Sequence, residues 1–161
     1  MAAVDAFLKL DGIKGESKDD KHKEEIDVLG WSWGLSQTGT FGGGGCGGAG
    51  KVSVHDISIT KRMDKSSPEL QLRVCNGKHI KEAVLVVRKA GEHPLEYFKV
   101  TLEDIIVSSY STGGSGGDVI LHENISLNFA KMKIEYVEQD EKGKGKAPIK
   151  YGWDVSANKA L

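Results

Sequence analysis

Apolar and polar residues alternate along most of the chain, and this period of two predicts β-strands. A first strand is expected over residues 4–10 and a long one over residues 26–36, IDVLGWSWGLS. Residues 51–62 also alternate, but their phase changes near Asp56, which indicates a bulge or bend. A similar change after Phe129 indicates a second bulge. Further strands are predicted over residues 83–88, 95–109 (as one strand or two), 124–137 and 149–155.

One segment is predicted to be helical. Ser66 and Glu69 have the spacing of a capping box, Pro68 suits the first turn, and Gly77 follows as a C-terminal stop. Cys75 falls at the end of this helix, where we expect a buried or half-buried residue. One short helix among seven or eight strands predicts a mainly β fold, a compact β-barrel of two sheets with one short α-helix. The length of the chain suits a single domain over residues 1–161.

The two faces of the long strand differ in character. Leu29, Trp31 and Trp33 fall on one face, and core packing is the expected role of such large rings. The opposite face consists of Gly30, Ser32 and Gly34. Because these residues are small and polar, they cannot form a core, and we expect them to meet water or another backbone.

Composition and charge narrow the classes of partner. Hydrophobic residues make up 39% of the chain, charged residues 28%, and the net charge is -1, which argues against nucleic acid as a partner. The N-terminus lacks the features of a signal peptide, and no apolar run approaches a membrane span of roughly 18 residues, so no membrane insertion is expected.

Cys46 and Cys75 are too few for a disulfide framework and are expected as free thiols. The charge-dense residues 15–25 are expected to form a solvated loop.

Candidate catalytic motifs do not assemble into a site. The five histidines show no metal-ligand spacing, and His55 and Asp56, adjacent on a strand, point to opposite faces. Residues 45–51 match the G-x-x-x-x-G-K pattern of a phosphate loop, but Val52 stands where Ser or Thr must ligate magnesium. A strand, rather than the required helix, is predicted to follow. We therefore predict no enzyme, no catalytic residue, no metal and no cofactor.

Two glycine-rich segments indicate self-assembly. Residues 38–50, TGTFGGGGCGGAG, are predicted to be either a flexible hairpin tip or an arm that becomes ordered against a neighbouring molecule, and both remain open. Residues 107–117 begin in a strand and run into a glycine loop. Long strands with small-residue faces favour edge-to-edge joining of sheets.

Six stretches of sequence carry a family resemblance. They are EIDVLGWSWG from Glu25, GAGKVSVHDISITKRMDKSSPEL from Gly48, RKAG from Arg88, SSYSTGGSGG from Ser108, ENISLNFAKMKIEY from Glu123 and KYGWDV from Lys150. In this order and spacing they closely resemble the hemolysin-coregulated protein family, the tube proteins of bacterial type VI secretion. The resemblance covers nearly the whole chain.

The resemblance implies a tail-tube-like β-barrel whose copies form a homohexamer with a central pore. Rings of the protein would stack into a tube, with a spike protein at the tip and a contractile sheath around it. The protein would assemble in the cytoplasm and then be secreted, outside the cell or into a target cell, without a cleaved signal peptide. Small effector proteins would be carried or chaperoned in the ring lumen.

By position, the resemblance assigns three groups of site residues. Gly30, Ser32 and Gly34 are expected to face the lumen, and Ser111, Thr112, Gly113, Gly114 and Ser115 are expected at a ring edge. The expected inter-subunit or inter-ring loop comprises Thr38, Gly39, Thr40, Phe41, Gly42, Gly43, Gly44, Gly45, Cys46, Gly47, Gly48, Ala49 and Gly50.

Two other functions remain as alternatives. A monomeric β-barrel binding module would hold a small ligand between its sheets, although the sequence offers no convergent polar groups for such a pocket. A nucleotide hydrolase would use the glycine tract.

Overall fold

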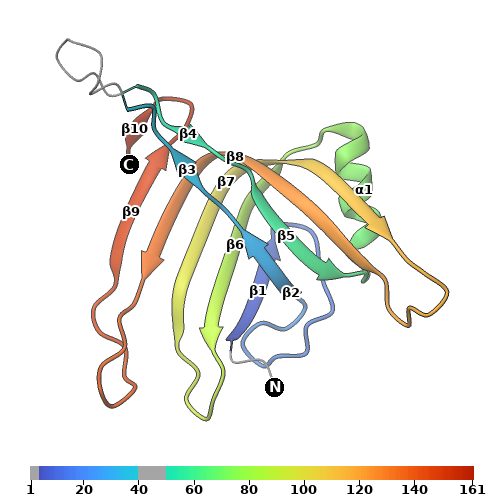
Figure 1. Cartoon of the computed structure of the whole chain (residues 1–161), viewed down its shortest axis with the longest axis horizontal. Coiled ribbons are helices and arrows are strands. Elements are labelled where there is room, and N and C mark those ends of the chain that lie inside the picture. The colour runs from blue at the N-terminus through green and yellow to red at the C-terminus, as the bar shows by residue number, and fades with distance from the viewer. Residues whose placement is uncertain (1–3, 40–49) are drawn as a thin grey trace.

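The computed structural model describes residues 4–39 and 50–161. Most of the expected inter-subunit loop, residues 40–49, therefore lies outside the described residues. The described residues form ten strands and one helix (Figure 1): β1 Val4–Leu10, β2 Ile26–Ser32, β3 Leu35–Ser36, β4 Ser53–Val54, β5 Ile57–Arg62, α1 Ser67–Asn76, β6 Ile80–Lys89, β7 Glu96–Gly113, β8 His122–Tyr136, β9 Ile149–Asp154 and β10 Lys159–Ala160.

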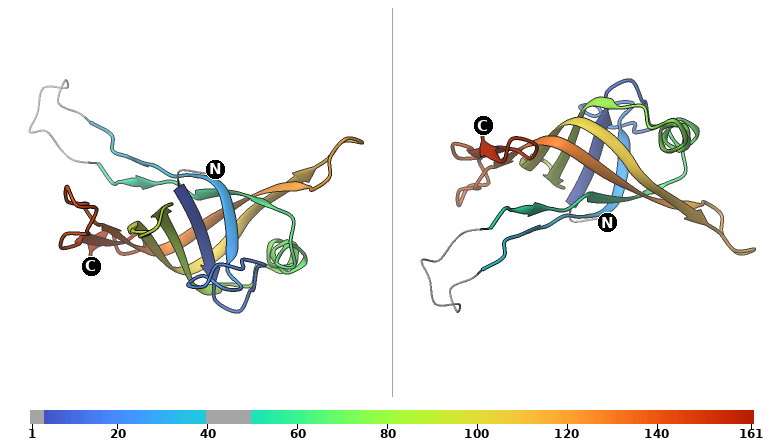
Figure 2. Two further views of the ribbon diagram at one scale, coloured as in Figure 1. Left: turned by 90° about the horizontal axis from the view of Figure 1, so that it is seen from below. Right: turned by 90° about the horizontal axis from the view of Figure 1, so that it is seen from above.

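Six of the strands close into an antiparallel barrel in the order β1-β2-β5-β8-β7-β6, because β6 pairs with β1 and β7 pairs with both β6 and β8. β9 pairs with the second half of β8, and β10 pairs with β9. β3 and β4 form a separate two-stranded sheet that continues β2 and β5 into an arm (Figure 2). The prediction of a mainly β barrel with one short helix is confirmed.

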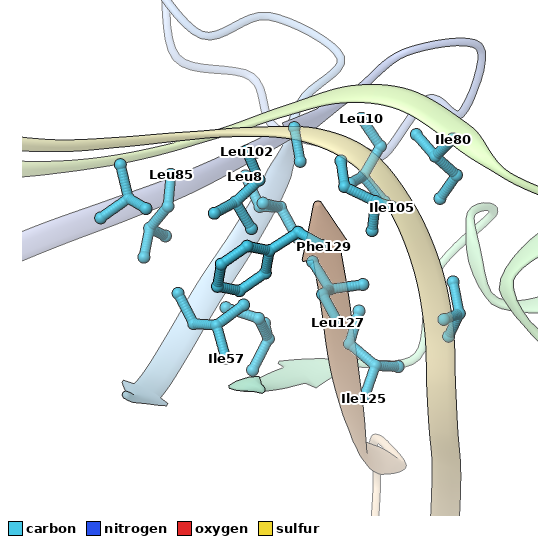
Figure 3. Close-up of a cluster of buried hydrophobic side chains, with 14 of the residues drawn as sticks. Leu8, Leu10, Ile57, Ile80, Leu85, Leu102, Ile105, Ile125, Leu127 and Phe129 are labelled. Carbon is cyan, nitrogen blue, oxygen red and sulfur yellow. The ribbon is translucent and has the colours of Figure 1, made fainter. Parts of the chain in front are cut away.

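Aliphatic and aromatic side chains fill the interior of the barrel. Figure 3 shows ten of them pointing toward one another from β1, β5, β6, β7 and β8: Leu8, Leu10, Ile57, Ile80, Leu85, Leu102, Ile105, Ile125, Leu127 and Phe129. All ten are buried. A ligand-binding barrel would need a cavity where these side chains pack, so the core gives no support to the binding-module alternative.

A bulge changes the facing of the long strand predicted over residues 26–36. The register of β2 against β5 shifts between Val28 and Gly30. Ile26 is therefore in the core before the bulge, whereas after it Trp31 is the residue opposite the buried Ile59 and stacks on Phe98. Leu29 lies at this register shift and is 46% exposed, so the prediction that it shares a face with the tryptophans is wrong. The expected core packing holds for Trp33, which packs against the core, but not for Trp31, which is 38% exposed.

The two predicted changes of phase are present. β4 and β5 are separated at residues 55–56, as the pattern near Asp56 predicted. β8 stays one strand, but its buried face passes from Phe129 to Met132. On the paired strand, Asp104 has a left-handed φ of 56°, which lets both Leu102 and Ile105 point into the core.

The helix has the predicted ends, but the predicted capping box is not formed. Ser66 makes no side-chain capping bond to the helix backbone, and the Glu69 carboxylate instead accepts a 2.8 Å bond from Nε of Arg73. Gly77 does end the helix, with a φ of 65° and its N–H donating to the Arg73 carbonyl. Cys75 is exposed, so the prediction of a buried or half-buried thiol is wrong.

A buried ion pair lies beneath the start of α1. Lys61 of β5 and Glu123 of β8 are directly opposed, in contact, and both 0% exposed. The Lys61 ammonium also donates to Asp64 Oδ1 at 3.0 Å, and Glu123 accepts bonds from the hydroxyls of Ser67 (2.6 Å) and Tyr110. Burial and the bond to Glu123 raise the pKa of Tyr110. The network joins the helix to the barrel wall.

The charge-dense segment before β2 is folded against the barrel. The His22 ring is buried and stacks on Phe7, with centroids 4.3 Å apart. Its Nδ1 and Nε2 each lie 2.7 Å from a carboxylate oxygen, of Glu25 and Glu96 respectively. The expectation that all of residues 15–25 form a solvated loop is therefore wrong.

Breaking the buried ion pair should be costly. Lys61→Ala leaves the Glu123 carboxylate buried without its cation, and we expect a loss of about 3–5 kcal/mol in the free energy of unfolding by urea. The matched control is Lys133→Ala, because Lys133 pairs with Glu103 on the surface at 3.3 Å. That change should cost less than about 1 kcal/mol. Equal losses in the two variants would contradict the role of the buried pair.

The segment of residues 15–25 should make the stability of the protein depend on pH in the acid range. The Arg88 guanidinium donates two bonds to Asp19, at 2.6 and 3.1 Å, and lowers the pKa of this carboxyl from 3.8 to about 2. The resulting stabilisation is present above pH 3.8 and is lost as the pH falls to about 2. The stability difference between wild type and Asp19→Asn should therefore shrink through this window. A matching pH dependence for Asp20→Asn, at the exposed neighbour, would contradict the assignment.

Candidate assembly and lumen surface

The outward face of β2, β5, β8 and β7 carries two rows of small uncharged residues that cross all four strands. Directly opposed residues of antiparallel strands lie on the same face, so the register defines each row. The first row is Ser32, Ser58, Ser126 and Ser109, and the second is Gly30, Thr60, Asn124 and Ser111. We call these eight residues the polar face. The row between them is Trp31, Ile59, Ile125 and Tyr110. Ile59 and Ile125 belong to the core and Tyr110 packs against it, whereas Trp31 is 38% exposed and stacks on Phe98.

Hydrogen bonds fix the polar face and its border. The Thr60 hydroxyl donates to Asn124 Oδ1 at 2.6 Å within the second row. At the border, Asp56 accepts one bond from the Ser108 hydroxyl at 2.6 Å and another from Nδ2 of Asn128 at 2.8 Å. Ser108 is the extra residue of a bulge in β7. Because of the bulge, the odd-numbered residues of β7 point inward before it and outward after it. Ser109 and Ser111 therefore lie on the polar face, although Val107 is buried.

The residues expected to face the lumen lie on or beside the polar face. Gly30 and Ser32 belong to its two rows. Gly34 follows β2, and its carbonyl accepts the N–H of His55 at 3.1 Å. A Cβ at Gly34 would lie 3.3 Å from the His55 ring, so the small residue permits close packing there.

Sequence reasoning missed the members of the polar face that lie on β5 and β8, and it assigned Ser111 to a ring edge. Ser58 and Thr60 alternate with buried isoleucines, so the pattern of β5 alone could have identified them. Ser126 and Asn124 alternate in the same way along β8. What the sequence could not show is the register that aligns them across four strands.

The residues expected at a ring edge lie at the end of β7. Ser111, Thr112 and Gly113 pair with β8, and the Thr112 hydroxyl donates to the His122 carbonyl at 2.8 Å. Gly114 and Ser115 begin the turn that follows. The hairpin of β7 and β8 projects beyond the barrel as one end of the molecule (Figure 2). These residues are thus placed at an extremity of the sheet.

The sheet that carries the polar face has an open edge on each side. β1 pairs with β2 only through Ile26–Val28, so among the described residues no strand covers this side of residues 29–32. β6 pairs with β7 only as far as Ile105, so in the described chain the β6 side of residues 106–113 has no strand partner either. Because the four strands alternate in direction, β7 of one copy would run antiparallel to β2 of another. Such edges are templates for adding a strand.

The described residues give little support to a phosphate loop or a metal site. In the described residues, Val52 precedes strand β4 and not a helix, so the geometry of a phosphate loop is not formed there. The part of the chain that the structure describes contains no group of three His, Cys, Asp or Glu side chains arranged to hold a metal. α1 is the single helix of that part, and it has neither the length nor the hydropathy to cross a membrane.

Comparisons with known proteins show which family the chain resembles. The family described as "Type VI secretion system effector, Hcp" matches residues 7–136. Protein hcp1 of Pseudomonas aeruginosa is 53% identical over 158 residues, which cover 97% of this chain and 98% of that protein.

Solved structures give the same result. A structure of a type six secretion system protein is 33% identical and covers 99% of this chain and 100% of its own, with a TM-score of 0.93. Hcp1 from Salmonella typhimurium is 43% identical with the same coverage and a TM-score of 0.82. The family match spans most of the chain and extends over the barrel and the polar face, and this chain belongs to the Hcp family of type VI secretion system proteins.

Proposed function

We propose that this protein is a tube subunit of a type VI secretion system, in which six copies form a ring and rings stack into a tube. The observation that carries the proposal is the four-stranded polar face with an open edge on both sides. Membership of the Hcp family supports the same conclusion. We propose no enzymatic activity for it.

Joining the open edges builds the ring. If β7 of one copy pairs with β2 of the next, the sheet continues from copy to copy through a heterologous contact, and a rotation that closes gives a ring. Each row of the polar face then continues around the ring. Gly30, Ser32 and Gly34 would line the lumen together with Ser58 and Ser126, and none of these side chains is charged.

An uncharged lining suits transient cargo. Hydroxyl and amide groups exchange hydrogen bonds with water at little net cost, so a passing protein is neither strongly held nor repelled. We propose that small effector proteins are carried in this lumen. Residues 38–50 would reach a neighbouring subunit or ring, and residues 111–115 would lie at the ring edge.

The remaining partners are those of a contractile machine. In the proposed assembly the tube is surrounded by a contractile sheath and tipped by a spike protein. The subunit assembles in the cytoplasm and leaves the cell when the sheath contracts, without a cleaved signal peptide.

The ring predicts a native mass six times the 17.4 kDa of the chain, measurable by native mass spectrometry and light scattering. Leu29→Lys places a charge at the open edge of β2, and lysine at an edge opposes strand pairing. We expect this variant to be folded and mostly monomeric. Ile149→Lys, at an exposed position of β9, is the matched control and should keep the ring. A wild-type monomer at every concentration up to millimolar would contradict the proposal.

The position of the polar face in the ring can be tested by thiol labelling. In a chain with Cys46 and Cys75 replaced by serine, Ser58→Cys should react readily with N-ethylmaleimide but much more slowly with a maleimide that carries a long polymer. The ring would exclude the polymer from its lumen and admit the small reagent. Ile149→Cys should react with both reagents, and urea should abolish the difference. Equal polymer labelling of Ser58→Cys and Ile149→Cys in intact rings would place the polar face outside the lumen.

A further inference from the structure

A pocket adjoins the polar face beyond its first row. It has a volume of about 250 Å³, and its lining includes His79, Asp104, Ile106 and Asn128. Asn128 follows Ser126 of the first row by two residues along β8, and Ile106 is the residue opposite it on β7. Residues two apart on a strand point to the same face, so the pocket lies on the side of the sheet that carries the polar face. We call it the border pocket.

The polar atoms that the border pocket presents are hydrogen-bond acceptors. The Asp104 carboxylate cannot donate, so Nδ1 of His79, 2.8 Å from its Oδ1, donates the bond between them, and Nε2 of a neutral ring is then an acceptor. Nδ2 of Asn128 donates to the Asp56 carboxylate at 2.8 Å, which leaves Oδ1 of the same amide as an acceptor. Within the described part of the chain, no donor bonds to Oδ2 of Asp104 or to Oδ1 of Asn128.

The border pocket also carries negative charge without a matching lysine or arginine. Asp104 is 61% exposed and pairs only with His79 among the described residues. The Asp56 carboxylate, next to the pocket, accepts its two side-chain bonds from the uncharged Ser108 hydroxyl and Asn128 amide. A group that brings both hydrogen-bond donors and positive charge therefore suits the polar part of the pocket.

The rest of the lining includes apolar side chains. Ile106 is 37% exposed although it lies beside a polar face, and Val54 and Val155 also line the pocket. Lysine and arginine combine a methylene stem with a cationic head that only donates, so the stem can pack on these side chains while the head reaches Asp104. The volume of about 250 Å³ is below the roughly 300 Å³ or more of pockets that take whole small molecules, so a single side chain fits.

We propose that the border pocket binds a lysine or arginine side chain of a cargo protein, so that the lumen selects effectors with a basic surface. The proposal rests on the ring of the proposed function, in which the pocket borders the lumen lining. One contact between an exposed carboxylate and a cation is weak. Six pockets around a ring act together on a cargo that carries several basic side chains, and the uncharged rows between them still let it pass.

A matched pair of peptides tests the charge selectivity. The probe is a fluorescent peptide with three arginines separated by Gly-Ser, and its partner carries citrulline, a neutral analogue of similar shape, in place of each arginine. In fluorescence anisotropy with assembled wild-type rings, the arginine peptide should bind more tightly than the citrulline peptide, and added salt should reduce the difference. Equal affinities for the two peptides would overturn the inference.

Variants of the pocket locate the binding. Asp104→Asn removes the charge and keeps the backbone, because asparagine tolerates the left-handed φ of 56°. We expect the arginine peptide to bind about tenfold more weakly, since several weak contacts are lost together. Ser156→Asp adds a carboxylate to the lining and should tighten binding of the same peptide.

The matched control is Glu103→Gln. It removes the same charge from the preceding residue of β7, which pairs with Lys133 at 3.3 Å and does not line the pocket. This variant should bind the arginine peptide like wild type. Equal losses in Asp104→Asn and Glu103→Gln would show a general effect of net charge and would overturn the inference.

The outcomes separate this inference from the proposed function. Rings of normal mass that bind both peptides alike would overturn the border pocket and leave the ring intact. Rings that fall apart in Asp104→Asn would also overturn it, because a neighbouring copy and not cargo would then supply the cation. A wild-type chain that remains monomeric would instead defeat the proposed function.

Discussion

The pairing of β7 with β8 is the interaction on which the rest of the structure depends. It runs from Phe98 opposite Tyr136 to Gly113 opposite His122, far beyond what the closure of the barrel requires. β6 leaves β7 at Ile105, and β5 pairs with β8 no further than Leu127. The two long strands thus close the barrel, carry half of the polar face, and project the hairpin that turns between Gly113 and His122.

One pair of strands can serve both core and surface because its alternation is interrupted twice. The left-handed φ of Asp104 and the bulge at Ser108 re-aim the side chains on either side of them. A backbone in this region is unfavourable for a residue other than glycine, so it persists only where the surrounding structure fixes it. The pairing of β7 with β8 on both sides of Asp104, at Glu103 and Ile105, supplies that constraint.

The sequence predicted much of the fold but less of the candidate site. Strands with strict alternation, such as residues 4–10, were predicted with the observed bounds, and both changes of phase were visible in the pattern. The bulge at Val28–Gly30 was missed because glycine leaves no apolar residue to mark the change of face. The capping box failed because Glu69 pairs with Arg73, a competition that residue spacing does not reveal.

The sequence by itself determined the fold class, the Hcp resemblance and the identity of a small polar face around Ser32. These follow from local periodicity and from residue types, which are properties of one segment at a time. Only the tertiary structure decided that Ser32, Ser58, Ser126 and Ser109 form one row and that β2 and β7 keep open edges. Register between strands far apart in the chain depends on closing the barrel around its core, and no single segment contains that information.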